Sequence, residues 1–141
     1  MSVITTPHLN FRGDARAALE FYHSVFGGRL VVVSNEEAFS VETPEEAQQV
    51  KFGQVTGANG FQVMAFDVPA STSYDQGDKS LFVSVRGDSA DEIAELWSRL
   101  AEGSTVLVDL APSAFSPAYG MLKDAFGVVW VLDVAVAYEP A

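Results

Sequence analysis

The sequence contains one unit twice, and this repeat constrains the fold more than any other feature. Residues 8–28 read HLNFRGDARAALEFYHSVFGG, and residues 82–103 read FVSVRGDSADEIAELWSRLAEG. Each stretch runs from a short apolar strand through Arg-Gly-Asp into an amphipathic helix that ends on glycine. A repeat of this kind indicates that one supersecondary unit is used more than once. We therefore expect two similar modules.

Both helical segments carry apolar residues at helical spacing, which predicts one buried stripe on each helix. The stripes consist of Ala15, Ala18, Leu19, Tyr22 and Phe26 in the first helix and of Ile93, Leu96, Trp97 and Leu100 in the second. Asp14 can cap the start of the first helix, while Ser89 and Glu92 form a capping box for the second. Gly27-Gly28 and Gly103 are expected to end the two helices.

Three short β-type runs follow each helix. They span residues 30–34, 50–55 and 61–68 after the first helix, and 105–110, 118–123 and 128–134 after the second. Asn59-Gly60 predicts a hairpin between the second and third runs. The last run of each set ends in an Asp-Val pair, which places Asp67 and Asp133 at equivalent points of the repeat.

The element order predicts an α+β fold of two βαβββ modules, at approximately 1–70 and 78–138. No linker rich in Pro, Gly or Ser separates them, so we expect a single domain over residues 1–141. Each helix covers the outside of its module, and the mixed sheets then curve around a cup.

Strand alternation assigns side chains to the two faces of each sheet. In the first strand Leu9 and Phe11 face the helix, and His8, Asn10 and Arg12 face away from it. In the fifth strand the residues expected toward the helix are Leu81, Val83 and Val85, and those expected away from it are Ser80, Phe82 and Ser84. The inner face therefore mixes polar and aromatic groups, which suits a small-molecule pocket better than a dry core.

Composition narrows the functional classes. The 141 residues are 48% hydrophobic and carry a formal charge of −11, and none of the eight basic residues cluster, which argues against nucleic-acid binding. No apolar run approaches the ~20 residues of a membrane helix, and the N-terminus has no export signal. There is no cysteine for a disulfide or a thiolate site. We expect a cytoplasmic protein without a membrane partner, and the exposed sheet edges favour a homodimer.

Paired β-α-β-β-β modules resemble the vicinal-oxygen-chelate superfamily, which includes glyoxalase I, bleomycin- and fosfomycin-resistance proteins and extradiol dioxygenases. Two stretches, PHLNFRGDARAALEFYHSVFGG and YGMLKDAFGVVWVLDV, are similar to its PhnB-like branch. Members of that branch read Ala-Leu-x-Phe-Tyr and Phe-Gly-Gly early, and Asp-x-Phe-Gly-x-x-Trp late. The likeness covers almost the whole chain.

The resemblance implies that metal-using relatives take ligands, usually His and Glu, from the first, fourth, fifth and eighth strands. The corresponding candidates here are His8, Asp67, Ser80 or Phe82, and Val131, with Asp133 two residues beyond. Catalytic divalent sites generally need three protein ligands. We therefore predict no cofactor, and a weak divalent site formed by His8, Asp67 and Asp133 is the alternative.

The predicted function is binding of a small molecule whose identity the sequence does not reveal. The predicted pocket consists of His8, Asn10, Asp67, Ser80, Phe82, Tyr119, Val131 and Asp133. The alternative is a lyase-, transferase- or oxygenase-type enzyme acting on a small oxygenated or antibiotic-like substrate, with His8 as general base. A third reading is an interaction role for the acidic loop 35–48.

Two further features of the sequence allow more than one interpretation. Arg12 either pairs with a carboxylate, from a ligand or from one of the aspartates, or is solvated. PhnB-like chains have often been labelled ubiquinone methyltransferases, but the glycine-rich stretch 53–60 lies in a predicted hairpin with no helix after it. Without a helix N-terminus to receive phosphate, it does not predict a nucleotide-type site for S-adenosylmethionine.

Overall fold

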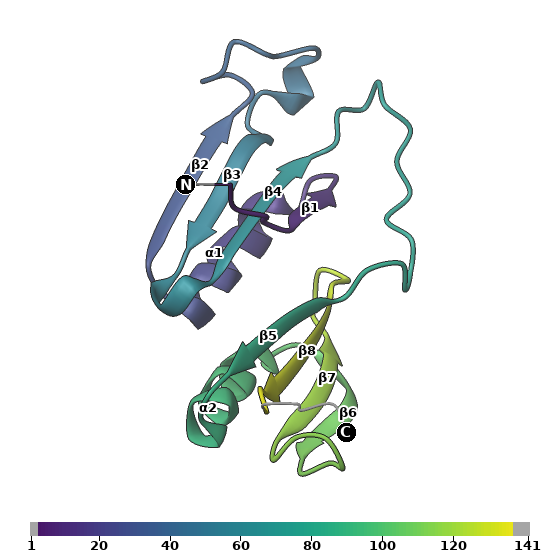
Figure 1. Ribbon diagram of the computed structural model, residues 1–141. Helices are drawn as coiled ribbons and strands as arrows, with labels where there is room; N and C mark the ends of the chain where they lie inside the picture. The colour runs from purple at the N-terminus through teal and green to yellow at the C-terminus, as the bar shows by residue number, and fades with distance from the viewer. Residues whose placement is uncertain (1–2, 137–141) are drawn as a thin grey trace. The chain divides into compact units, whose positions relative to one another are not determined.

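A computed structural model describes residues 3–136 and divides the chain into two compact units, Met1–Gly77 and Asp78–Ala141 (Figure 1). Within each unit one helix packs on one face of a four-stranded sheet. Residues 137 and 138, which the sequence assigned to the second module, lie outside the described residues. None of the helices within residues 3–136 is both long and apolar enough to cross a membrane.

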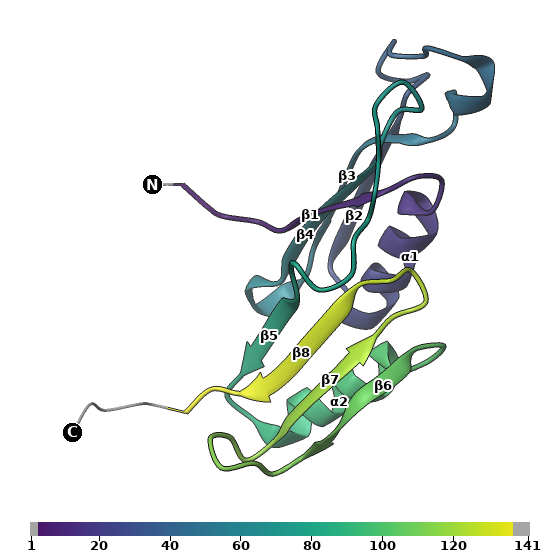
Figure 2. The ribbon, with the colours of Figure 1, turned by 90° about the vertical axis from the view of Figure 1, so that its right-hand side faces the viewer.

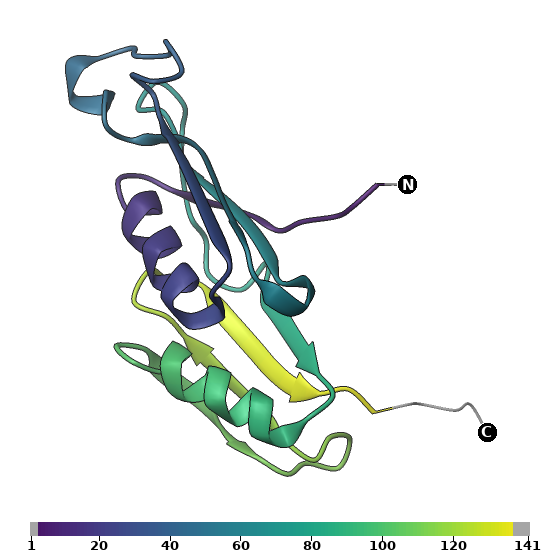
Figure 3. The same cartoon turned by 90° about the vertical axis from the view of Figure 1, so that its left-hand side faces the viewer.

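The first unit contains β1 (His8–Phe11), α1 (Ala15–Phe26), β2 (Arg29–Ser34), β3 (Val50–Thr56) and β4 (Gln62–Asp67). Its strand order is β1-β4-β3-β2, with β1 parallel to β4 and the other pairs antiparallel. Short 3-10 helices lie at Pro44–Glu46 and Ala58–Gly60. Helix α1 runs along one face of this sheet (Figure 3).

The second unit repeats the plan with β5 (Val83–Gly87), α2 (Ala90–Leu100), β6 (Thr105–Ala111), β7 (Tyr119–Lys123) and β8 (Val129–Val134). Its order, β5-β8-β7-β6, has the same parallel pair at the first strand. Helix α2 covers one face of the sheet (Figure 2). The predicted α+β class with two βαβββ modules is confirmed, whereas the cup and the single domain stay predictions.

Each helix buries an apolar stripe against its sheet. In α1 the buried residues are Ala15, Ala18, Leu19, Tyr22 and Val25, so Val25 takes the place predicted for Phe26. The Phe26 ring instead stacks on Phe61, with 3.7 Å between ring centroids. In α2, Ile93 and Leu100 are buried, while Leu96 and Trp97 are half-buried.

A glycine in the middle of each sheet lets the helix come close. A Cβ atom on Gly53 of β3 would lie 2.3 Å from Leu19 Cδ1, and one on Gly120 of β7 would lie 2.9 Å from Trp97 Cη2. Because real Cβ contacts are not that short, only glycine allows these large side chains to reach the sheet. The two glycines lie on corresponding strands of the two units, so the repeat includes the way in which each helix packs on its sheet.

The helix ends and the turn between β3 and β4 confirm most of the predicted capping and turn residues. Gly27 follows α1 with φ 69° and donates to the His23 carbonyl, and Ser89 accepts from the Glu92 amide at the start of α2. Asn59 and Gly60 both have positive φ between β3 and β4, as expected for an Asn-Gly turn. One prediction was wrong, because the Asp14 side chain makes no capping hydrogen bond to α1.

Candidate ligand-binding faces

The sheet face turned away from α1, which we call the helix-distal face of the first unit, carries His8, Asn10, Gln54, Met64 and Phe66. Strand pairing places His8 beside Met64, Asn10 beside Phe66, and Gln54 beside Met64. His8 and Asn10 are exposed, and the other three are half-buried. The face thus combines hydrogen-bonding groups with a thioether and an aromatic ring, as small-molecule sites do.

His8 is held in a defined orientation on this face. Its ring meets Phe66 edge-on at 5.1 Å between centroids, and its Nδ1 lies 3.0 Å from Asn10 Oδ1. Since a carbonyl oxygen can only accept, this contact requires the proton on Nδ1 of the neutral ring. The other ring nitrogen, Nε2, is then the acceptor that the side chain offers to a ligand.

Asp67 lies on the opposite face of the same sheet and is 4% exposed. Its Oδ1 accepts from the amides of Gly13 and Ala15, at 2.7 and 3.1 Å, and its Oδ2 accepts from the Val50 amide at 2.9 Å. This carboxylate caps α1 in place of Asp14 and joins the helix start to β3. All three contacts are backbone amides of the same unit, which gives Asp67 a structural role, and its predicted pocket and metal role stays a prediction.

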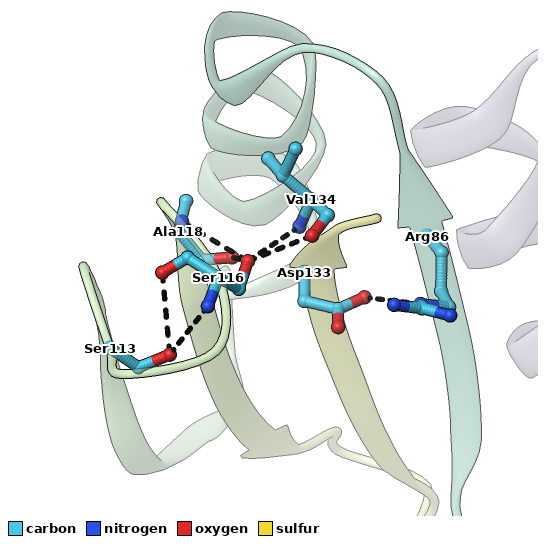
Figure 4. Close-up of polar contacts among 6 residues, drawn as sticks. All are labelled: Arg86, Ser113, Ser116, Ala118, Asp133 and Val134. Atoms are coloured by element: carbon cyan, nitrogen blue, oxygen red, sulfur yellow. Dashed lines mark hydrogen bonds and ion pairs between the residues drawn. The ribbon is translucent and has the colours of Figure 1, made fainter. Parts of the chain in front are cut away.

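The helix-distal face of the second unit carries Ser84, Arg86, Tyr119, Val131 and Asp133. Arg86, Asp133 and Tyr119 form one row across β5, β8 and β7, and Ser84 and Val131 lie in the next row. Arg86 Nε donates to Asp133 Oδ1 at 3.1 Å (Figure 4). The Asp133 side chain is 12% exposed and that of Arg86 56% exposed. Phe115 meets the Tyr119 ring edge-on at 4.8 Å.

A one-residue difference in strand register separates the two aspartates that the sequence makes equivalent. Asp67 pairs with Phe11, whereas Asp133 pairs with Arg86, one position further along the repeat. Because side chains alternate between the faces of a sheet, a shift of one residue moves a side chain to the other face. Asp67 therefore faces its helix, and Asp133 faces away from its own.

Ser116 fixes the end of β7 and β8 next to this row (Figure 4). Its hydroxyl contacts the Val134 and Ala118 carbonyls at 2.9 and 2.8 Å and accepts from the Val134 amide at 3.1 Å. Ser113 in turn donates to the Ser116 carbonyl. This network holds the backbone next to Tyr119, at Ala118, and next to Asp133, at Val134.

Strand β5 begins later than predicted, and this changes the site. Ser80 and Phe82 precede the strand, and Leu81, expected to face the helix, is 82% exposed. The strand positions that reach the helix-distal face are therefore Ser84 and Arg86. Sequence reasoning did not select Arg86, although it has the same strand parity as Ser84 and occupies the position of Arg12 in the repeat.

Arg12 holds the segment that follows β4. It donates to the carbonyls of Val68 and Pro69, at 3.3 and 3.1 Å, and to that of Thr72. Its guanidinium lies 5.2 Å from the Tyr74 ring centroid, and Tyr74 donates to the Asn10 carbonyl at 2.8 Å. Burial raises the pKa of the Tyr74 phenol, which keeps this donor protonated. Arg12 is an exposed residue whose guanidinium donates to backbone carbonyls, and its pairing with a ligand carboxylate stays a prediction.

The late motif that carries the family resemblance has a structural explanation. Asp124 Oδ1 accepts from the amides of Phe126 and Val128, and its Oδ2 accepts from Trp130 Nε1 at 2.8 Å. Trp130 is fully buried against α2. The Asp-x-Phe-Gly-x-x-Trp pattern is therefore a hairpin clamp between β7 and β8 that anchors the core of the second unit.

The helix-distal faces fit a divalent metal poorly. Within residues 3–136 no group of three or more His, Cys, Asp or Glu side chains could hold a metal ion. At the positions where the resemblance places ligands, β4 presents Met64 and Phe66, and β8 presents Val131. Asp133 is engaged by Arg86, and His8 by Asn10. A thioether, a phenyl ring and an isopropyl group do not supply the oxygen and nitrogen donors that such a site needs.

Comparison with known proteins locates the family. The model of the family described as 3-demethylubiquinone-9 3-methyltransferase matches residues 4–132. Among curated proteins, none matches the chain significantly.

Solved structures agree with this result. Protein PA1353 from Pseudomonas aeruginosa is 30% identical, over 94% of this chain and 98% of that one, with a TM-score of 0.81. A putative 3-demethylubiquinone-9 3-methyltransferase, the PhnB protein from Bacillus cereus, is 25% identical over 94% and 100% of the two chains, with a TM-score of 0.69. A glyoxalase/bleomycin resistance/dioxygenase domain from Frankia sp. EAN1pec shares the fold at 16% identity, over 96% and 99%, with a TM-score of 0.65.

The duplicated βαβββ plan, the clamp at Asp124 and these matches lead to one conclusion. The chain belongs to the PhnB-like family described as 3-demethylubiquinone-9 3-methyltransferase, and it shares its fold with glyoxalase/bleomycin resistance/dioxygenase proteins.

Proposed function

We propose that the protein binds a small organic molecule on the helix-distal faces of its sheets and does so without a metal cofactor. The observation that carries the proposal is the chemistry of these faces. Each combines oriented polar groups, His8 with Asn10 and Arg86 with Asp133, with half-buried apolar and aromatic side chains. Sites with a few placed polar groups on an apolar lining are typical of small-molecule recognition.

The methyltransferase activity in the family's description is not part of this proposal. The glycine-rich stretch 53–60 forms the end of β3 and the turn into β4. The starts of both helices are already capped by side chains of the chain itself, α1 by Asp67 and α2 by Ser89. A helix N-terminus that is occupied in this way has lost amides that would otherwise receive the phosphate or carboxylate of a cofactor.

Catalysis by His8 is the second candidate function, and one contact favours it. The bond from Nδ1 to Asn10 fixes the orientation of the ring, as a general base requires, and it leaves Nε2 to accept a proton from a substrate. If His8 is a general base, the wild type consumes a bound compound and His8→Ala does not, which mass spectrometry of the compound measures. If the protein only binds, the compound stays unchanged with the wild type and with His8→Ala.

A ligand panel tests the main proposal. Small carboxylates, phenols, quinones and antibiotics are screened by thermal unfolding of the full chain, in EDTA and in Mg²⁺, Mn²⁺, Ni²⁺ or Zn²⁺. A ligand present at about 100 times its Kd is expected to raise the Tm by several degrees, because it stabilises the folded state by about 2.7 kcal/mol. The shift should be the same with and without EDTA.

His8→Ala supplies the control for a metal site. A divalent ion that raises the Tm of the wild type, but not that of His8→Ala, contradicts the metal-independent proposal. Failure of the whole panel to change the Tm counts against binding itself.

A further inference from the structure

The two Arg-Gly-Asp arginines occupy equivalent positions but have different surroundings. Arg12 is engaged by three backbone carbonyls and by the Tyr74 ring. Arg86 makes a single bond, from Nε to Asp133, and within residues 3–136 its two Nη groups have no hydrogen-bond partner. The guanidinium extends beyond Asp133 on the side away from β8 (Figure 4).

The bond through Nε has a geometric consequence. A guanidinium has five N–H donors in a rigid planar fork, and the edge formed by the two Nη groups matches both oxygens of a carboxylate or phosphate. Asp133 holds the group from the Nε side and leaves that edge available. Asp133 is itself mostly buried, so it restricts the side chain to one orientation and lowers the entropy cost of engaging a ligand.

The neighbouring residues on the same face are apolar or aromatic. Val131 and Met121 lie in the row next to Arg86 and Asp133, and Tyr119 follows Asp133 in the Arg86 row, with Phe115 against its ring. All three strand residues are half-buried, and Phe115 is 61% exposed. Adjacent strands lie about 4.8 Å apart, so a ligand body of one ring held by Arg86 on β5 reaches Val131 on the adjacent β8, and Met121 and Tyr119 lie one strand further, on β7.

We infer that the helix-distal face of the second unit binds a small organic anion. The oxyanion lies on the Nη edge of Arg86, and the apolar body lies on Val131, Met121 and Tyr119. Asp133 is a positioning residue that orients Arg86. This inference rests on the proposed function, and it further specifies that the ligand carries a negative charge.

Three probes with the same ring separate the contributions. Phenylacetate carries a carboxylate, phenylphosphonate carries a phosphoryl group, and phenylacetamide is neutral. Each is titrated into the full-length protein and followed by NMR, with the backbone amides of β7 and β8 and the Arg86 Nε–H as reporters. At least one anion should bind about tenfold or more tightly than the amide, because a bidentate charge-assisted contact is lost in the neutral compound. The anion that binds more tightly shows whether the site prefers a carboxylate or a phosphoryl group.

Arg86→Gln alone would leave Asp133 mostly buried without its partner, so the decisive variant is Arg86→Gln combined with Asp133→Asn. This pair replaces the ion pair by two amides that can still bond to each other. The double variant should weaken anion binding about tenfold or more. Arg99→Gln, which removes a positive charge on α2 from the ion pair with Glu95, should leave it unchanged.

Asp133→Asn alone distinguishes positioning from direct contact. It keeps an acceptor for Arg86 Nε and removes a negative charge, so anion affinity should hold or rise. A loss of affinity in this variant would show that Asp133 itself contacts the ligand, which contradicts its assignment as a positioning residue.

Three results would overturn the inference. The first is equal binding of the amide and the anions, and the second is anion affinity retained in the double variant; in both cases the protein would still bind a small molecule, but not through Arg86. The third is the absence of any shift in β7 or β8 with all three probes at their solubility limits. The metal-independent ligand panel described above is scored separately, so failure of this inference can be distinguished from failure of the proposed function.

Discussion

Replacing Asp67 by alanine is expected to lower the free energy of unfolding of the first unit by about 3–5 kcal/mol, since buried amides lose a charged acceptor. The amides of Ala15 and Val50 are buried, and both would be left without their partner. Urea unfolding followed by circular dichroism gives the free energy. Hydrogen exchange shows whether the loss of protection begins at these two amides and at the first turn of α1.

Asp133→Ala is the matched control, because the sequence makes the two aspartates equivalent while the structure places them on opposite faces. Asp133 bonds to one half-exposed arginine, so its loss should cost about 1 kcal/mol. Equal destabilisation by the two substitutions would contradict the register difference that separates them. Unchanged exchange at Ala15 and Val50 in Asp67→Ala would contradict the capping role.

Replacing Asp124 by alanine should destabilise the second unit by about 3 kcal/mol, because it leaves a buried indole N–H unpaired and removes two hairpin contacts. Trp130 is fully buried, so no water replaces the lost acceptor without opening the core. Chemical unfolding followed by tryptophan fluorescence measures the effect.

A double-mutant cycle with Trp130→Phe isolates the contact between the two side chains. Because phenylalanine has no N–H, Asp124→Ala should cost about 1–2 kcal/mol less in that background. Asp109→Ala in the exposed strand β6 is the control, with an expected effect below about 0.5 kcal/mol. Additive effects of Asp124→Ala and Trp130→Phe would show that the bond between Asp124 and the Trp130 indole does not stabilise the fold.

The sequence predicted the elements well because their signals are local. The stripe on α1, the Asn59-Gly60 turn and the Ser89 cap depend on residues a few positions apart. The family resemblance depends on the same kind of signal, since the bonds from Asp124 to Phe126, Val128 and Trp130 span no more than six positions. Local patterns were therefore sufficient for the fold class and the family.

The candidate site was predicted less well because it depends on pairing between distant strands. Asp67 and Asp133 look alike until the register of β4 against β1 and of β8 against β5 is known. The cap of α1 was assigned to the adjacent Asp14, but an aspartate more than fifty residues away supplies it. Arg86 is absent from the predicted site because the sequence pattern predicts an earlier start of β5, which places Ser80 and Phe82 on the inner face.

The central claim is that these sheets present a ligand-binding surface in which metal donors are replaced by aliphatic, aromatic and amide side chains. Elemental analysis of untagged protein, purified without chelators and without added metal, tests it most directly. We predict that zinc, nickel, iron and manganese are each present far below one atom per chain. One atom of any of them per chain, lost together with ligand binding in His8→Ala or Asp133→Ala, would contradict the claim.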